Sequence, residues 1–327
     1  MFGTNREPEN RMMRSLFTIL AAFVLAASHG PAAAQAVRFA TISEGTYVWP
    51  IYVAQAKNMF EREGVSVQFT VTGSATRHIE ELLRGTYDIG LQQSDGIVRA
   101  VEGGADLFIF MPMAHLPAFS LITAPAIGRI EDLRGKAVAV DSPRGGYTLL
   151  LRRMLSAKGL TTADYTMTLA GGSKEKDAAM RSGAALATLI NPPFDANLVA
   201  AGFRNLGTIK EQFPDYPGPS GAARRAWVRD NEKSLVAFIR AINAAYAWLQ
   251  EPKNKNEAIE ILNTRLKIAP ALASTEFDAF GMQPRPTLTP GGLKQVIDMV
   301  WDAEGYKTQP GIPEKYFDPG YLLKAGG

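Results

Sequence analysis

Residues 50–96, PIYVAQAKNMFEREGVSVQFTVTGSATRHIEELLRGTYDIGLQQSDG, carry the alternation that decides the fold. Pro50–Glu63 predicts a helix, because proline suits a first helical turn and a glycine follows its end. Val65–Thr72 alternates apolar and polar residues, as a half-buried strand does. Thr76–Arg84 predicts a second helix, and Tyr87–Leu91 an apolar strand. This order indicates parallel strands with helices on both faces of the sheet.

The same alternation recurs further along the chain. Strands are expected at Ala137–Val140, Tyr165–Leu169 and Ala185–Ile190, with helical stretches between them, and Asp230–Glu251 predicts a long helix. A chain of 327 residues exceeds what one hydrophobic core usually serves. The sequence therefore predicts an α/β protein of two lobes, each a mostly parallel sheet flanked by helices.

Residues 1–36 have the three parts of a secretory signal peptide. Arg11 and Arg14 precede an apolar run, Leu16–Ala27, and small residues follow up to Ala36. We expect cleavage after Ala36, with cleavage after Ala34 as the alternative; a membrane anchor is the competing interpretation of the apolar run. The protein has no cysteine, so an exported form carries no disulfide and no lipid-modified N-terminal cysteine.

Composition and motifs exclude several classes of function. Removing three of the 35 basic and two of the 32 acidic residues with the signal leaves 32 and 30, a nearly neutral chain that is not expected to bind nucleic acid. The sequence has no recognisable nucleophile, phosphate-binding or zinc motif. His78 and His115 have no partner at metal-ligand spacing. We therefore expect no catalytic residue, no metal and no cofactor.

Candidate ligand-binding residues follow from the loops after the predicted strands, because α/β units bind ligands at the carboxyl ends of their strands. Two such units facing each other form a cleft, and polar side chains mixed with aromatic ones suit a small-molecule site. The alternative for the aromatic residues of the first loop is packing beneath that loop. The expected site residues are Ser43, Tyr47, Trp49, Ser74, Thr76, Gln92, Ser94, Asp95, Ser142, Arg144, Gly145, Gly146, Tyr147, Ser173 and Asn191.

The segment 141–147, DSPRGGY, joins a predicted strand to a helix and suggests an anionic ligand. The first turn of a helix leaves backbone N–H groups without internal partners and carries a partial positive charge. Gly145 and Gly146 permit close approach of a ligand, and Arg144 would add a two-pronged donor. In the alternative, Ser142 caps the helix and Arg144 lies in solvent. We expect a small organic anion, with a neutral heteroaromatic molecule as the alternative.

Four segments in this order resemble the periplasmic solute-binding proteins of ABC importers, in the group that binds nitrate, taurine, alkanesulfonates and pyrimidine precursors. They are PIYVAQAKNMFEREGVSVQF (50–69), GSATRHIEELLRGTYDIGLQQSDG (73–96), IEDLRGKAVAVDSPRGGYTLLLRRMLSAKGL (130–160) and DNEKSLVAFIRAINAAYAWLQEPKNKNEAIEIL (230–262). One departure is Asn191–Pro192–Pro193, where the family often has an acidic residue before proline. The branch that makes a pyrimidine uses cysteines, and this chain has none.

The resemblance implies a type II periplasmic binding protein whose chain crosses between the lobes twice. The crossings are expected near 119–124 and 222–228, with lobe 1 formed by 37–120 plus 229–327 and lobe 2 by 121–228. It also implies a monomer in the periplasm that presents a captured small molecule to an ABC permease. A secreted enzyme on the same fold and a ligand-sensing subunit of a signalling receptor are the alternatives.

Overall fold

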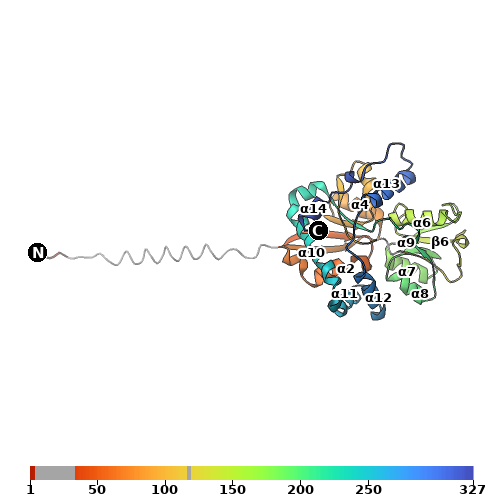
Figure 1. Ribbon diagram of the computed structural model, residues 1–327, viewed down its shortest axis with the longest axis horizontal. Helices are drawn as coiled ribbons and strands as arrows, with labels where there is room; N and C mark the ends of the chain where they lie inside the picture. The colour runs from red at the N-terminus through yellow and green to blue at the C-terminus, as the bar shows by residue number, and fades with distance from the viewer. Residues whose placement is uncertain (4–33, 116–118, 327) are drawn as a thin grey trace. The chain divides into compact units, whose positions relative to one another are not determined.

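The computed structural model describes residues 1–3, 34–115 and 119–326. The expected signal peptide lies almost wholly outside the described residues. Contacts divide the chain into Met1–Ala34 and Gln35–Gly327, and the fold below is that of the second unit (Figure 1). In the described part of the chain, no helix is both long and apolar enough to cross a bilayer.

The first lobe is built on a five-stranded sheet in the order β2-β1-β3-β10-β4. Strand β1 pairs in parallel with β2 and β3, as the βαβ pattern predicts, whereas β10 runs antiparallel between β3 and β4. The strands are β1 (Gln35–Thr41), β2 (Val65–Val71), β3 (Ile89–Gln92), β4 (Leu107–Pro112) and β10 (Ser220–Arg224).

The helices of lobe 1 come from both ends of the chain. The segment expected as one helix at 50–63 is two helices, because Asn58 takes a left-handed conformation with φ 51° and interrupts the hydrogen-bond ladder. The helices are α2 (Trp49–Ala56), α3 (Met59–Arg62), α4 (Ala75–Arg84), α5 (Ser94–Glu102), α10 (Arg225–Leu249), α11 (Lys255–Leu266), α12 (Pro270–Gly281), α13 (Pro290–Glu304) and α14 (Gly320–Lys324).

The second lobe has its own five-stranded sheet, in the order β7-β6-β8-β5-β9. Strand β6 pairs in parallel with β7 and β8, and β5 is antiparallel to β8 and β9. Its elements are β5 (Ser120–Thr123), β6 (Ala137–Val140), α6 (Gly146–Ser156), β7 (Thr166–Leu169), α7 (Ser173–Arg181), β8 (Ala187–Ile190), α8 (Phe194–Ala200), β9 (Arg204–Thr208) and α9 (Ile209–Gln212).

The chain passes from the first sheet to the second between β4, which ends at Pro112, and β5, which begins at Ser120. It returns between α9, which ends at Gln212, and β10, which begins at Ser220. The crossing expected near 119–124 therefore overlaps β5, and the one expected near 222–228 overlaps β10 and the start of α10. This two-sheet architecture confirms the predicted fold class.

Candidate functional site

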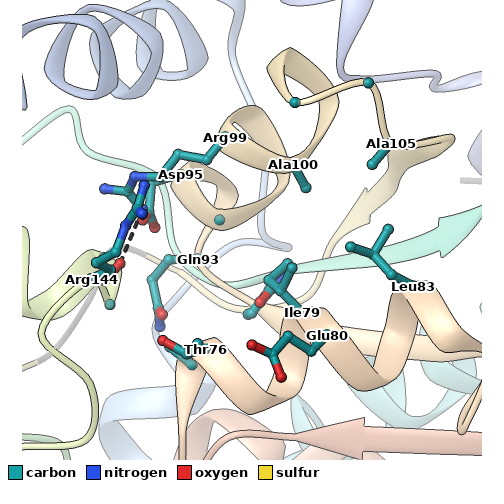
Figure 2. A pocket seen from close by; sticks show the side chains of 17 residues that line it. Thr76, Ile79, Glu80, Leu83, Gln93, Asp95, Arg99, Ala100, Ala105 and Arg144 are labelled. Carbon is teal, nitrogen blue, oxygen red and sulfur yellow. Dashed lines mark hydrogen bonds and ion pairs between the residues drawn. The ribbon is translucent and has the colours of Figure 1, made fainter. Parts of the chain in front are cut away.

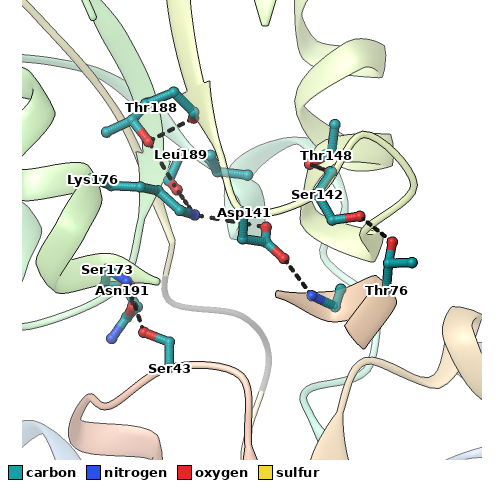
Figure 3. Close-up of polar contacts among 12 residues, drawn as sticks. Ser43, Thr76, Asp141, Ser142, Thr148, Ser173, Lys176, Thr188, Leu189 and Asn191 are labelled. Atoms are coloured by element: carbon teal, nitrogen blue, oxygen red, sulfur yellow. Dashed lines mark hydrogen bonds and ion pairs between the residues drawn. The ribbon is translucent and has the colours of Figure 1, made fainter. Parts of the chain in front are cut away.

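The loops at the carboxyl ends of strands from both sheets meet along one seam between the lobes (Figure 3). Several hydrogen bonds cross it. The Ser173 N–H donates to Ser43 Oγ at 2.9 Å, and the Thr76 and Ser142 hydroxyls lie 2.7 Å apart. The Ala75 N–H donates to Asp141 Oδ2 at 3.1 Å, and Asn191 Nδ2 donates to the Glu44 carbonyl at 3.2 Å. We call this arrangement, with the lobes in contact across the seam, the closed form.

Glycines allow this close approach of the lobes. A Cβ atom on Gly146 would lie 2.0 Å from Asp95 Oδ1, and one on Gly45 would lie 1.9 Å from Asn191 Nδ2. Neither distance is compatible with a side chain. One glycine comes from each lobe, so the seam depends on small residues on both of its faces.

A cavity of about 20 Å³ is enclosed in the seam, and we call it the chamber. Both lobes contribute to its walls, and in the closed form it has room for a water molecule. Tyr147 stacks on Phe119 with 3.6 Å between ring centroids at one wall. The lining residues are Ile42, Ser43, Tyr47, Gln93, Phe119, Asp141, Tyr147, Gly172, Ser173 and Lys176.

Lys176 brings a buried positive charge to the chamber. It lies in the first turns of α7, and only 4% of the residue is exposed. Its ammonium donates to the Leu189 carbonyl at 3.1 Å and stands 4.0 Å from Asp141 Oδ1 (Figure 3). Burial lowers the pKa of Lys176, and the negative charges of Asp141 and Glu175 oppose that shift.

The tyrosines of the chamber are hydrogen-bond donors. Burial raises the pKa of Tyr147 well above its usual value, so its hydroxyl keeps its proton. That hydroxyl lies near Gln93 but makes no well-formed hydrogen bond with any described residue. The Tyr47 hydroxyl is already engaged, since it donates to the Ser43 carbonyl.

A larger, open groove of about 500 Å³ adjoins the seam between α4, α5 and the start of α6 (Figure 2). Its outer half is aliphatic, with Ile79, Leu83, Ala100 and Ala105. Gln93 lines both the groove and the chamber. Residues of both lobes line the chamber and the groove, and the chamber alone has a buried lysine in its wall.

The structure brings together many of the residues expected at the site. Ser43, Tyr47, Tyr147 and Ser173 line the chamber. Thr76, Ser142 and Asn191 form the hydrogen bonds of the seam. Residues that line the groove beside it are Thr76, Gln92, Asp95, Arg144, Gly145 and Gly146.

Three expected residues lie elsewhere. Trp49 is fully buried in the lobe 1 core, packs edge-on against Phe277 and donates its indole N–H to the Ala258 carbonyl. Ser94 is buried against Ser220 of β10. Ser74 is the N-cap of α4 and accepts from the Arg77 N–H. The loop pattern placed these three at the cleft, but core packing and capping account for them.

Arg144 does not point into the chamber. Its side chain is 66% exposed and pairs with Glu304 of α13 at 2.7 Å. The guanidinium therefore faces Glu304 and the groove, and its role in holding the ligand's anionic group stays a prediction. The reason is the C-terminal helix α13, which offers a carboxylate at the place where the sequence alone shows only a glycine-rich helix start.

Lys176 and Asp141 are chamber residues that the sequence did not single out as ligand-binding. Lys176 stands in the charged run 174–177, KEKD, which has the composition of an exposed helix surface. Its spacing of three from Ser173 is the one available signal, because it places both on the same helix face. Among the described residues, no group of three or more acidic or histidine side chains is placed to hold a metal ion.

Comparison with known proteins agrees with this geometry. A family described as NMT1/THI5 like matches residues 45–255, nearly two thirds of the chain. The chain belongs to the NMT1/THI5-like family. The resemblance stated from the four sequence segments is thus confirmed at the level of the family and of the fold.

The relatives and structural neighbours of this chain carry names that describe different activities. The bicarbonate transport ATP-binding protein CmpC of Synechocystis is 23% identical over 66% of this chain, which spans only 35% of that protein. The 4-amino-5-hydroxymethyl-2-methylpyrimidine phosphate synthase of Schizosaccharomyces pombe is 28% identical, over 40% of this chain and 38% of that protein. The periplasmic nitrate-binding protein NrtA of Synechocystis superposes with a TM-score of 0.72 at 16% identity, covering 89% of this chain and 88% of that one.

Proposed function

We propose that this protein is the extracytoplasmic solute-binding subunit of an ABC-type importer and that it captures a small organic anion between its lobes. The observation that carries the proposal is the closed chamber, whose walls come from both sheets and whose seam is bridged by hydrogen bonds. A site divided in this way forms only when the lobes come together, so a ligand that contacts both lobes favours the closed form.

The capture cycle follows from the two crossings. The chain connects the two sheets twice, and hinge motion between the lobes would part the seam and admit a ligand. A ligand larger than water would hold the chamber wider than it is in this closed form. The closed protein would then present its surface to a membrane permease as a monomer in the periplasm.

Binding without covalent chemistry distinguishes this proposal from an enzyme on the same fold. The chamber has a lysine, an aspartate and tyrosines, but no cysteine, and neither histidine of the expected mature chain lines it. Asp141 is held by a backbone N–H, and Lys176 has its pKa lowered only by burial. Nothing in this set forms a nucleophile paired with a base.

The test is native mass spectrometry of the protein isolated from its export compartment under mild conditions. We expect one bound small molecule per chain, released on unfolding and recovered unchanged after incubation with fresh protein. Conversion of that molecule into a product, at a rate that one substitution in the chamber abolishes, would instead identify an enzyme.

A further inference from the structure

Lys176 carries a positive charge at the wall of the chamber that has few hydrogen-bond and ion-pair partners. Its ammonium has three N–H donors, and among the described residues one of them is used, by the Leu189 carbonyl. The nearest carboxylate oxygen, Asp141 Oδ1, is 4.0 Å away, beyond hydrogen-bond distance. Burying an ammonium in this way is costly unless a partner with good geometry is supplied.

Asp141 is the natural counter-charge, but it is engaged across the seam. Its Oδ2 accepts the N–H of Ala75 at 3.1 Å. Ala75 is the first residue of α4, where backbone N–H groups have no partner within the helix. Lys176 and Asp141 belong to lobe 2, whereas Ala75 belongs to lobe 1. The carboxylate therefore has two competing partners, and one of them is available only when the lobes are closed.

A second donor faces the same space. Tyr147 is 8% exposed, its ring lines the chamber, and its hydroxyl has no hydrogen-bond partner among the described residues. An ammonium and a phenol at one wall provide two donors of the kind that bind the oxygens of a carboxylate or sulfonate. A neutral ligand would leave the buried charge of Lys176 as poorly compensated as before.

We propose that Lys176 is the residue that recognises the ligand, by binding an oxyanion group, and that Asp141 couples this binding to closure. The inference rests on the proposed function and names the chemical class of its ligand. With the lobes apart, Asp141 pairs with Lys176. The incoming anion takes the place of Asp141 beside Lys176. The released Asp141 carboxylate then crosses the seam to the start of α4. The distances in the closed form, 4.0 Å to Lys176 and 3.1 Å to Ala75, are those of the second arrangement.

The experiment compares matched anions and neutral isosteres as probes: propionate against propionamide, and methanesulfonate against methanesulfonamide. Thermal shift and calorimetry are run on the wild type, K176Q and the control K174Q, whose residue is the exposed neighbour on α7. We expect the anions to bind the wild type and K174Q, and K176Q to lose at least about tenfold in affinity, as removal of a charge-assisted bond does.

Two further variants separate recognition from a merely structural ion pair. D141N removes the competing charge, so we expect anions to bind it as tightly as the wild type or more tightly, with less lobe closure by small-angle scattering. The double variant K176Q/D141N removes both charges and guards against misfolding caused by one unpaired charge; it should fold and show no anion response.

The outcomes distinguish this inference from the proposed function. Binding of neutral probes that closes the lobes, or anion binding unchanged in K176Q, would overturn the role of Lys176 and leave a solute-binding protein. A failure of all four anionic and neutral probes to bind the wild type would also overturn it. The proposed function fails separately, if native mass spectrometry finds no bound molecule.

Discussion

Gly146 begins α6 and lies against Asp95 across the seam. Because a Cβ atom there would be 2.0 Å from Asp95 Oδ1, we predict that G146A obstructs closure while each lobe folds normally. Overpacking of this kind costs about 1–3 kcal/mol. Ligand affinity should therefore fall by about ten- to hundredfold in calorimetry, with little change in the melting temperature of the ligand-free protein.

The matched control for that variant is G291A, in the first turn of α13. A Cβ atom on Gly291 has no neighbour within 4 Å. This control should bind ligand like the wild type. If G146A retained full affinity, the closed seam would not be the binding arrangement.

His78 links stability to pH. It is fully buried on α4 beside Tyr87, with ring centroids 5.1 Å apart, and burial lowers its pKa to about 3. In the unfolded chain the pKa is about 6.5, so below that value the unfolded state binds more protons. The contribution of neutral, buried His78 to the free energy of unfolding is therefore complete above pH 6.5 and is lost as the pH falls toward 3.

We therefore predict that lowering the pH from 7.5 to 5 costs the wild type about 2 kcal/mol through His78. Urea unfolding at both pH values measures it, and H78Q should lack this part of the loss. H115Q serves as the comparison for the other histidine of lobe 1. Identical pH dependence in H78Q and the wild type would show that His78 is not buried in its neutral form.

At the scale of elements, α13 joins the lobes from outside the chamber. It packs on α5 of lobe 1, and two of its carboxylates pair with arginines of lobe 2. Glu304 pairs with Arg99 at 2.8 Å and with Arg144 at 2.7 Å, and Asp302 pairs with Arg153 at 2.6 Å. Arg144 and Arg153 belong to lobe 2, so these two pairs exist only when the lobes are closed.

We predict that D302N/E304Q weakens ligand binding by about two- to tenfold, since exposed pairs contribute roughly 0.2–1 kcal/mol each. Raising salt should reduce wild-type affinity toward that of the variant, because exposed charges are screened. The control D298N breaks only the pair with Lys294 within α13. An affinity that salt and D302N/E304Q leave unchanged would show that α13 does not contribute to closure.

Elements were more predictable from the sequence than their roles. Periodicity and glycine stops predicted β2, α4 and β6 closely, because these signals are local. The bounds of β5 and β10 are hard to predict because these are short apolar strands whose pairing partners lie far away in sequence. Lys176 was missed for a similar reason: its contacts, Leu189 and Asp141, come from other parts of the chain, and the charged run around it resembles a solvated helix.

At the scale of the whole molecule, the start of the folded unit bears on export. Strand β1 begins at Gln35, whose N–H donates to the Gly64 carbonyl at 3.1 Å and whose Oε1 accepts from Ser234 at 2.6 Å. Cleavage after Ala36 would remove two residues of this strand. We therefore predict cleavage after Ala34, and mass spectrometry of the exported protein should find Gln35 first. A mature chain that starts at Val37, or one that keeps its first 34 residues, would contradict this.

Closure of the lobes around a ligand is the central claim, and small-angle X-ray scattering tests it most directly. The protein is stripped of bound solute by reversible unfolding, then measured alone and at saturation with the molecule that native mass spectrometry identifies. Hinge motion between the lobes predicts a smaller radius of gyration on binding, and G146A should show a reduced change. A radius of gyration that stays the same in the wild type at saturating ligand would contradict the account.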